Sequence, residues 1–133
     1  ALMSHSNFGS SEAPSAVKMR ETLAILRERA PNLEVDGEMH GDAALDEKLR
    51  DSLVPDSTLK GEDNLLVMPN IDAANIAFQL VKVLADALPV GPILMGAAKP
   101  AHILTPSVTA RGVVNMTAIA ATEAQSRDKW DPA

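Results

Sequence analysis

Short apolar runs alternate with longer stretches of helical periodicity along this chain, and this alternation constrains its fold more than any other feature. Strands are predicted at residues 1–6, 33–39 and 65–70, and a strand or extended segment is predicted at 90–96. Helices are predicted between them, up to about Ala30, over 42–53, from Ile71 to Leu88 and from Thr109 to Gln125. Strands and helices that alternate in this way favour a layered α/β fold.

Two of these helices carry sequence signals at their N-terminal ends. Ser10 or Ser11 can cap the first helix, and Pro14 fits its first turn, where a missing backbone N–H costs nothing. Asp42 is the expected cap of the short helix over 42–53. The buried side of the first helix is predicted from four residues that share one face, namely Met19, Leu23, Leu26 and Ala30.

The helix predicted over 71–88 is apolar around most of its circumference. Its polar residues lie three or four positions apart along one narrow stripe, made of Asp72, Asn75, Gln79, Lys82 and Asp86. A surface helix normally has a polar face about as wide as its apolar face. We therefore expect this helix to lie at the centre of a larger domain or to pair with a second copy at a subunit interface. The two interpretations are compatible.

Composition and charge exclude several classes of function. The chain has 133 residues, enough for one domain with its own core, and 46% of them are hydrophobic. Its net charge of −6, with 12 basic residues, argues against binding nucleic acid or an anionic membrane. No cysteine is present, which agrees with a cytoplasmic protein. No apolar run is long enough to span a bilayer. Because an apolar triplet opens the chain abruptly, we expect a fragment of a longer protein.

Residue types used in catalysis are present without a recognisable catalytic motif. The chain contains no G-x-G-x-x-G, G-x-x-x-x-G-K-[ST] or G-x-S-x-G sequence. No metal site is expected, because metal-ligand spacing is absent from the three histidines, His5, His40 and His102. A second group of candidates is the carboxylates of Asp36, Glu38 and Asp42. These could act as a pair, but the favoured interpretation is that they solvate a strand-to-helix turn.

Small and polar residues follow three of the apolar runs. They form the stretches SHSNFGSS, MPNIDAAN and AAKPAHILTPS. In open α/β sheets ligands bind where the strands end, and hydroxyls, backbone amides and helix N-termini there suit an anionic ligand. Lys99 would add a positive charge, although a solvated loop lysine is an equal alternative.

Four motifs in order resemble the C-terminal part of the phosphate acetyltransferase/butyryltransferase family. They are SHSNFGSS, VDGEMHGDAAL, LLVMPNIDAANIAFQL and VGPILMGAAKPAHIL, and the resemblance runs from about Ala1 to Ala121. It implies a three-layer α/β/α sandwich, of which this chain is a fragment. Residues 1–125 would form the C-terminal part of that domain, with βα units over 1–88 and a closing strand, loop and last helix over 89–125. Residues 126–133 would be a tail.

The resemblance also implies that this fragment does not transfer acetyl groups. Transferases of the family bind coenzyme A and acetyl phosphate in a cleft between two subdomains. The family's Ser–Arg pair and the Asp that follows it fall, without gaps, at Thr105, Pro106 and Gly112. Proline cannot replace a guanidinium that holds phosphate, and glycine cannot replace a carboxylate base.

The stretch AKPAHILTPSVTARGVVNMTAIA is similar to the C-terminal domain of the large bacterial NADP-dependent malic enzymes. That resemblance implies a regulatory and oligomerising domain with acetyl-CoA as its effector, which self-associates through apolar helices such as 71–88. It also implies a malic enzyme module in the same chain. That module would oxidatively decarboxylate malate to pyruvate with NADP and Mg or Mn, and no cofactor is expected within this fragment.

Contacts to the effector are expected from two loops. Phosphate and pantetheine groups would contact Ser6, Asn7 and Ser10 in the first loop and Lys99, His102, Thr105 and Ser107 in the last. One alternative is an active phosphate acetyl/butyryltransferase that uses Arg111 for phosphate, which Arg111→Ala would inactivate. Another is a structural module without a ligand, whose melting temperature would not respond to acetyl-CoA.

Overall fold

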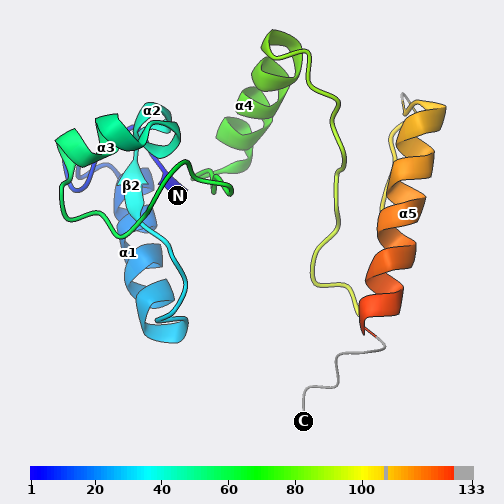
Figure 1. Cartoon of the computed structure of the whole chain (residues 1–133), viewed down its shortest axis with the longest axis horizontal. Coiled ribbons are helices and arrows are strands. Elements are labelled where there is room, and N and C mark those ends of the chain that lie inside the picture. Colours follow the sequence, from blue (N-terminus) through cyan, green and yellow to red (C-terminus); the bar gives the residue numbers. More distant parts are fainter. Residues whose placement is uncertain (107, 128–133) are drawn as a thin grey trace. The chain divides into compact units, whose positions relative to one another are not determined.

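The computed structural model describes residues 1–106 and 108–127, and Figure 1 shows the order of the elements along the chain. The chain consists of two compact units, one over Ala1–Val81 and one that begins at Lys82. Within the described residues, no helix has both the length and the apolar character needed to cross a membrane.

A short parallel sheet organises the first unit. β1 (Leu2–Met3) runs parallel to β2 (Gly37–Met39), with Leu2 paired to Gly37 and Met3 paired to Met39. The first two predicted strands, at 1–6 and 33–39, are therefore confirmed, although the observed strands are shorter. Every residue of both strands is buried, as is usual for a parallel sheet covered on both faces.

The third predicted strand, over 65–70, is reduced to a single parallel bridge between Leu2 and Val67. The Met3 N–H donates to the Val67 carbonyl, and the Val67 N–H donates to the Ala1 carbonyl, both at 2.9 Å. Because β1 is only two residues long, these bonds complete its ladder on that side. The prediction of a full strand here is wrong for this reason.

α1 (Pro14–Arg29) covers one face of the sheet. Its buried residues Met19 and Leu23 form an apolar cluster with Leu2 and Val35, and Leu26 packs against this cluster. Three of the four residues predicted for the buried side are therefore confirmed. Full burial of a side chain such as Leu23 contributes about 1.5–3 kcal/mol to folding. The fourth residue is Ala30, which follows the helix as its C-cap.

The N-terminal end of α1 differs from the prediction. Pro14 occupies the first turn as expected, but the N-cap is Ala13, and no side chain caps the helix. Ser10 and Ser11 are not caps because their hydroxyls have other partners. Ser10 Oγ accepts a hydrogen bond from the Asn7 N–H at 3.0 Å, and Ser11 Oγ accepts one from the Ala13 N–H at 3.2 Å.

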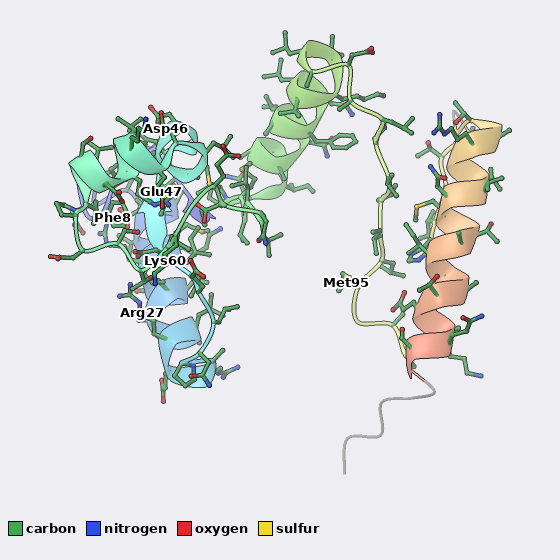
Figure 2. The ribbon with its side chains drawn as sticks, viewed as in Figure 1. Phe8, Arg27, Asp46, Glu47, Lys60 and Met95 are labelled. Atoms are coloured by element: carbon green, nitrogen blue, oxygen red, sulfur yellow. The ribbon has the colours of Figure 1, made fainter. Side chains whose placement is uncertain are left out.

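The helix predicted over 42–53 is split into α2 (Gly41–Leu45) and α3 (Glu47–Leu53). Asp46 separates them because its backbone is extended and its side chain caps α3, accepting a hydrogen bond from the Leu49 N–H at 3.1 Å. Figure 2 shows Asp46 and Glu47 where α3 begins. Asp42 lies inside α2, and its carboxylate accepts the neighbouring Ala43 N–H at 2.8 Å. The prediction that Asp42 is the cap is wrong.

Arg50 of α3 is completely buried below the end of α2. Its guanidinium donates hydrogen bonds to the carbonyls of Ala43, Ala44 and Gly61 at 3.1, 3.3 and 2.5 Å. These bonds satisfy carbonyls that a helix leaves unpaired at its C-terminal end, and they hold the 55–64 loop against α2. Asp63 lies 3.7 Å from the same guanidinium, and burial raises the pKa of its carboxyl group.

α4 (Ile71–Leu84) extends from the first unit into the second. Asn70 caps it by accepting a hydrogen bond from the Ala73 N–H at 2.9 Å. The helix ends before the predicted Leu88, because Asp86 has a positive φ of 46° and is unlike a helical residue. No residue of α4 is buried, so its wide apolar face is exposed, with Val83 75% accessible.

The described part of the second unit contains one further helix and no strand. α5 (Ala110–Arg127) confirms the last predicted helix and extends two residues into the predicted tail, of which residues 128–133 lie outside the described residues. Of the two alternatives predicted for the segment 90–96, a strand or an extended segment, the strand is not formed, because no neighbouring strand pairs with it among the described residues. Met95, labelled in Figure 2, is 81% exposed on this segment.

Candidate functional site

Glu38 of β2 is the centre of a buried polar cluster. Its Oε1 atom accepts hydrogen bonds from Ser6 Oγ at 2.6 Å, the Gly9 N–H at 2.9 Å and Arg20 Nη1 at 2.9 Å. Its Oε2 atom is buried and has no hydrogen-bond partner among the described residues. A protonated Glu38 would need to place its proton on Oε2, where no acceptor is available. The geometry therefore favours the ionised carboxylate.

Two opposing effects act on the pKa of Glu38. Burial would raise this pKa, but hydrogen bonds from Ser6, Gly9 and Arg20 outweigh burial and hold the pKa below its ordinary value of 4.5. Glu38 is therefore charged at neutral pH.

Asp36 and Glu38 do not solvate a turn, so that interpretation of the sequence is wrong for both. Asp36 is 3% exposed and Glu38 is not exposed at all, whereas Asp42 is exposed as expected. The Asp36 carboxylate accepts hydrogen bonds from four donors, namely Arg27 Nη2, the Gly37 N–H, Ser57 Oγ and the Thr58 N–H. Buried carboxylates need such partners, because burial without them is costly.

The loop between β1 and α1 brings three predicted ligand residues together, Ser6, Asn7 and Ser10. Ser6 Oγ and Ser10 Oγ lie 3.0 Å apart. Ser6 is completely buried, whereas Ser10 is exposed. Phe8, labelled in Figure 2, has a positive φ of 47°, and its N–H donates to the Glu38 carbonyl at 2.7 Å. This turn places the loop against β2.

Asn7 connects this loop to the residue that follows β2. Its Oδ1 accepts a hydrogen bond from the His40 N–H at 2.7 Å, and its Nδ2 lies 3.2 Å from His40 Nδ1. His40 Nε2 lies 2.9 Å from the His5 carbonyl, so Nε2 carries the ring hydrogen and Nδ1 accepts from Asn7. One hydrogen of the Asn7 amide is left for another partner.

Four predicted ligand residues belong to the second unit, and the structure describes three of them. The His102 side chain is 4% exposed, and its Nε2 lies 3.9 Å from Glu123 Oε2 of α5. Its Nδ1 accepts a hydrogen bond from the Leu94 N–H at 3.3 Å. Lys99 and Thr105 are exposed. Ser107 lies outside the described residues, and the meeting of this loop with the Ser6–Ser10 loop stays a prediction.

Thr105, Pro106 and Gly112, where the resemblance predicts changed catalytic residues, lie before and within the first turn of α5. The Thr105 carbonyl accepts a hydrogen bond from the Val108 N–H at 3.0 Å, and Pro106 has no polar side-chain atom. Gly112 lies in the first turn of α5. A Cβ atom at Gly112 would lie 2.8 Å from Val108 Cγ2, so a carboxylate side chain here would require Val108 to move.

Sequence reasoning missed Arg20 and the part that Glu38 plays. A glutamate inside the predicted strand 33–39 was the available signal, because a buried charge requires partners. Nothing in the sequence indicated that Arg20 would be one of them. Among residues 1–106 and 108–127, no group of three or more His, Asp or Glu side chains is arranged to hold a metal ion.

Residues 1–121 match the protein family described as phosphate acetyl/butaryl transferase. The chain is 65% identical to the NAD-dependent malic enzyme of Rhizobium meliloti and 57% identical to the NADP-dependent malic enzyme of Escherichia coli. These matches cover 92% and 96% of the chain but 16% and 17% of the two enzymes, so the chain spans about a sixth of their length.

Phosphate acetyltransferases are similar over a larger share of their own length. The phosphate acetyltransferase of Paracoccus denitrificans is 47% identical, over 91% of this chain and 38% of that protein. A phosphotransacetylase structure from Streptococcus pyogenes has a TM-score of 0.87 at 31% identity, over 94% of this chain and 39% of that one. The predicted fold class, an α/β fragment of the phosphate acetyltransferase type, is therefore confirmed.

Proposed function

Because the chain belongs to the phosphate acetyl/butaryl transferase family, we propose that it is the non-catalytic regulatory and oligomerisation domain of an NADP-dependent malic enzyme. The longer protein would convert malate to pyruvate by oxidative decarboxylation, using a malic enzyme module in the same chain. That module would bind the nicotinamide cofactor and Mg or Mn. The present domain would sense acetyl-CoA.

The observation that carries this proposal is that the chain has a higher sequence identity to malic enzymes than to a phosphate acetyltransferase. Identity is 65% and 57% to two malic enzymes and 47% to a phosphate acetyltransferase. One of these malic enzyme relatives is NAD-dependent and the other is NADP-dependent, so the assay below tests both nucleotides.

The chemistry at the changed positions supports a domain without transferase activity. Pro106 offers no guanidinium for a phosphate, and Gly112 offers no carboxylate for the coenzyme A thiol. The alternative is an active phosphate acetyl/butyryltransferase, for which Arg111 would have to hold the phosphate. Arg111 lies in the first turn of α5, where a cation opposes the helix dipole. These residue types therefore favour a domain that binds acetyl-CoA without transferring its acetyl group.

Self-association is supported by the exposed apolar face of α4. This face is formed by large side chains, among them Ile71, Ile76, Phe78, Leu80, Val81, Val83 and Leu84. Apolar patches of this kind mark interaction surfaces in folded proteins. For acetyl-CoA to inhibit the enzyme, it must bind the inactive arrangement of the oligomer more tightly than the active one.

The direct test is malate-dependent reduction of NADP, and separately of NAD, by the full-length protein during titration with acetyl-CoA. We expect inhibition, and we expect Lys99→Ala to raise the half-inhibitory concentration about tenfold, as loss of a charge-assisted hydrogen bond does. Lys48→Ala, an exposed lysine of α3, is the matched control and should respond like the wild type.

Each other outcome removes a different part of the proposal. Malate oxidation that ignores acetyl-CoA would overturn the sensing role and leave assembly as the function. Absence of malate oxidation with either nucleotide would overturn the assignment to a malic enzyme.

A further inference from the structure

The backbone donors of the 6–10 loop, residues Ser6 to Ser10, are already used inside the protein. Two of its N–H groups donate to serine hydroxyls, one to the Glu38 carbonyl, one to Glu38 Oε1 and one to the Asn7 carbonyl. Backbone sites that bind phosphate do so with free N–H groups. This loop therefore has no such groups to offer to a phosphate.

The hydroxyl groups of the loop have a fixed direction. The ionised Glu38 can only accept, so the Ser6 hydroxyl donates to it across 2.6 Å. Ser6 then has no hydrogen left, and Ser10 must be the donor in the 3.0 Å contact between the two hydroxyls. Ser10 Oγ also accepts the Asn7 N–H at 3.0 Å, which leaves one lone pair on an exposed residue. The loop therefore offers a ligand an acceptor through Ser10.

The net charge of the side chains around Arg20 also argues against a phosphate ligand. Arg20 contacts the carboxylates of Glu12 and Glu38, each at 2.9 Å. Two carboxylates beside one guanidinium leave the cluster net negative, and a phosphate is repelled by such a charge. An uncharged group with N–H or O–H donors fits better.

We propose that the 6–10 loop contacts the pantetheine arm of acetyl-CoA rather than its phosphates, with Ser10 Oγ accepting a hydrogen bond from an amide or hydroxyl of that arm. This inference rests on the proposed sensing of acetyl-CoA and deepens it. Ser6 and Glu38 are positioning residues, because they set the direction of the Ser10 hydroxyl without contacting the ligand.

Calorimetric titration of the full-length protein with three ligands tests this assignment. The ligands are acetyl-CoA, S-acetylpantetheine, which has the donors but no phosphate, and adenosine 3′,5′-bisphosphate, which has phosphates but no pantetheine. We expect Ser10→Ala to weaken binding of the first two about three- to tenfold, the usual effect of one lost hydrogen bond, and to leave the third unchanged. Ser52→Ala, at an exposed serine of α3, is the matched control and should change none of them.

Ser6→Ala separates positioning from a purely structural role. It removes the acceptor for the Ser10 hydrogen, so it should weaken S-acetylpantetheine while leaving adenosine 3′,5′-bisphosphate unchanged. Equal weakening of both ligands would show a structural role instead.

Two patterns for Ser10→Ala overturn the inference while the proposed function stands. One is weakening of adenosine 3′,5′-bisphosphate, and the other is unchanged binding of S-acetylpantetheine by a protein that binds acetyl-CoA. If the wild-type protein binds no acetyl-CoA, the sensing role and this inference fail together.

Discussion

At the scale of single residues, Glu38 shows how a charge is tolerated in the core of the first unit. Its partners Ser6, Gly9 and Arg20 come from a loop and a helix that precede it by 18 to 32 positions. Three donors on one oxygen compensate for the lost hydration of the carboxylate. The same contacts attach the 6–10 loop to β2, so the stability of the core and the shape of the candidate site depend on one side chain.

Glu38→Gln is expected to destabilise the protein at neutral pH and to lose this effect in acid. The pKa of Glu38 in the folded protein lies below 4.5, its ordinary value. Its charged form therefore stabilises the fold fully above that value, and this contribution is lost as the pH falls through the folded pKa. The free energy of unfolding by urea, measured from pH 7 downward, should begin to converge for the two proteins below about pH 4.5 and should coincide only below the lowered pKa of Glu38.

Glu62→Gln serves as the control for this series, since Glu62 is exposed, and it should track the wild type throughout. A gap between wild type and Glu38→Gln that stays constant into strong acid would contradict the ionised cluster.

At the scale of elements, the ends of the helices are decided by local hydrogen bonds that compete for the same side chains. Asp42 and Asp46 are both reasonable caps by residue type, and α3 uses Asp46. Ser10, a plausible cap for α1, donates instead to Ser6 in the loop. Residue type narrows the choice of a cap, but the backbone around it selects one.

Asp46→Ala should destabilise the first unit by about 1 kcal/mol, since the α3 N–H of Leu49 loses its acceptor. Asp42→Ala removes only a contact to its own neighbouring N–H and should have a smaller effect. Urea unfolding of both variants measures the difference. A larger loss for Asp42→Ala would mean that the helix over 42–53 is not divided at Asp46.

At the scale of the whole molecule, the exposed apolar surface of α4 is the dominant feature. Under the proposed function, we expect this surface to be covered either by another part of the same protein chain or by a second copy. These two partners make different predictions, because only the second changes the mass of the assembly.

Val83→Glu should therefore lower the oligomeric mass of the full-length protein in light scattering, because it places a charge on the apolar face. Gln79→Glu adds the same charge on the polar stripe of α4 and should leave the mass unchanged. If Val83→Glu lowers the melting temperature without changing the mass, another part of the same chain covers this face and self-association through α4 is wrong.

The sequence by itself determined the order and type of most elements in this protein. Short strand-like segments predicted β1 and β2, and helical spacing of apolar and polar residues predicted α1, α4 and α5. The motifs also indicated the family, which residues 1–121 match, and they predicted the 6–10 loop as a ligand-binding loop.

Only the tertiary structure decided the pairing of the strands and the partners of buried charges. The segments 65–70 and 90–96 are rich in apolar residues, but a strand forms only where a neighbouring strand pairs with it through backbone hydrogen bonds. The ion pair between Glu38 and Arg20 likewise depends on the tertiary structure. Their contact joins distant parts of the chain, and local periodicity contains no information about which distant donor will compensate a buried carboxylate.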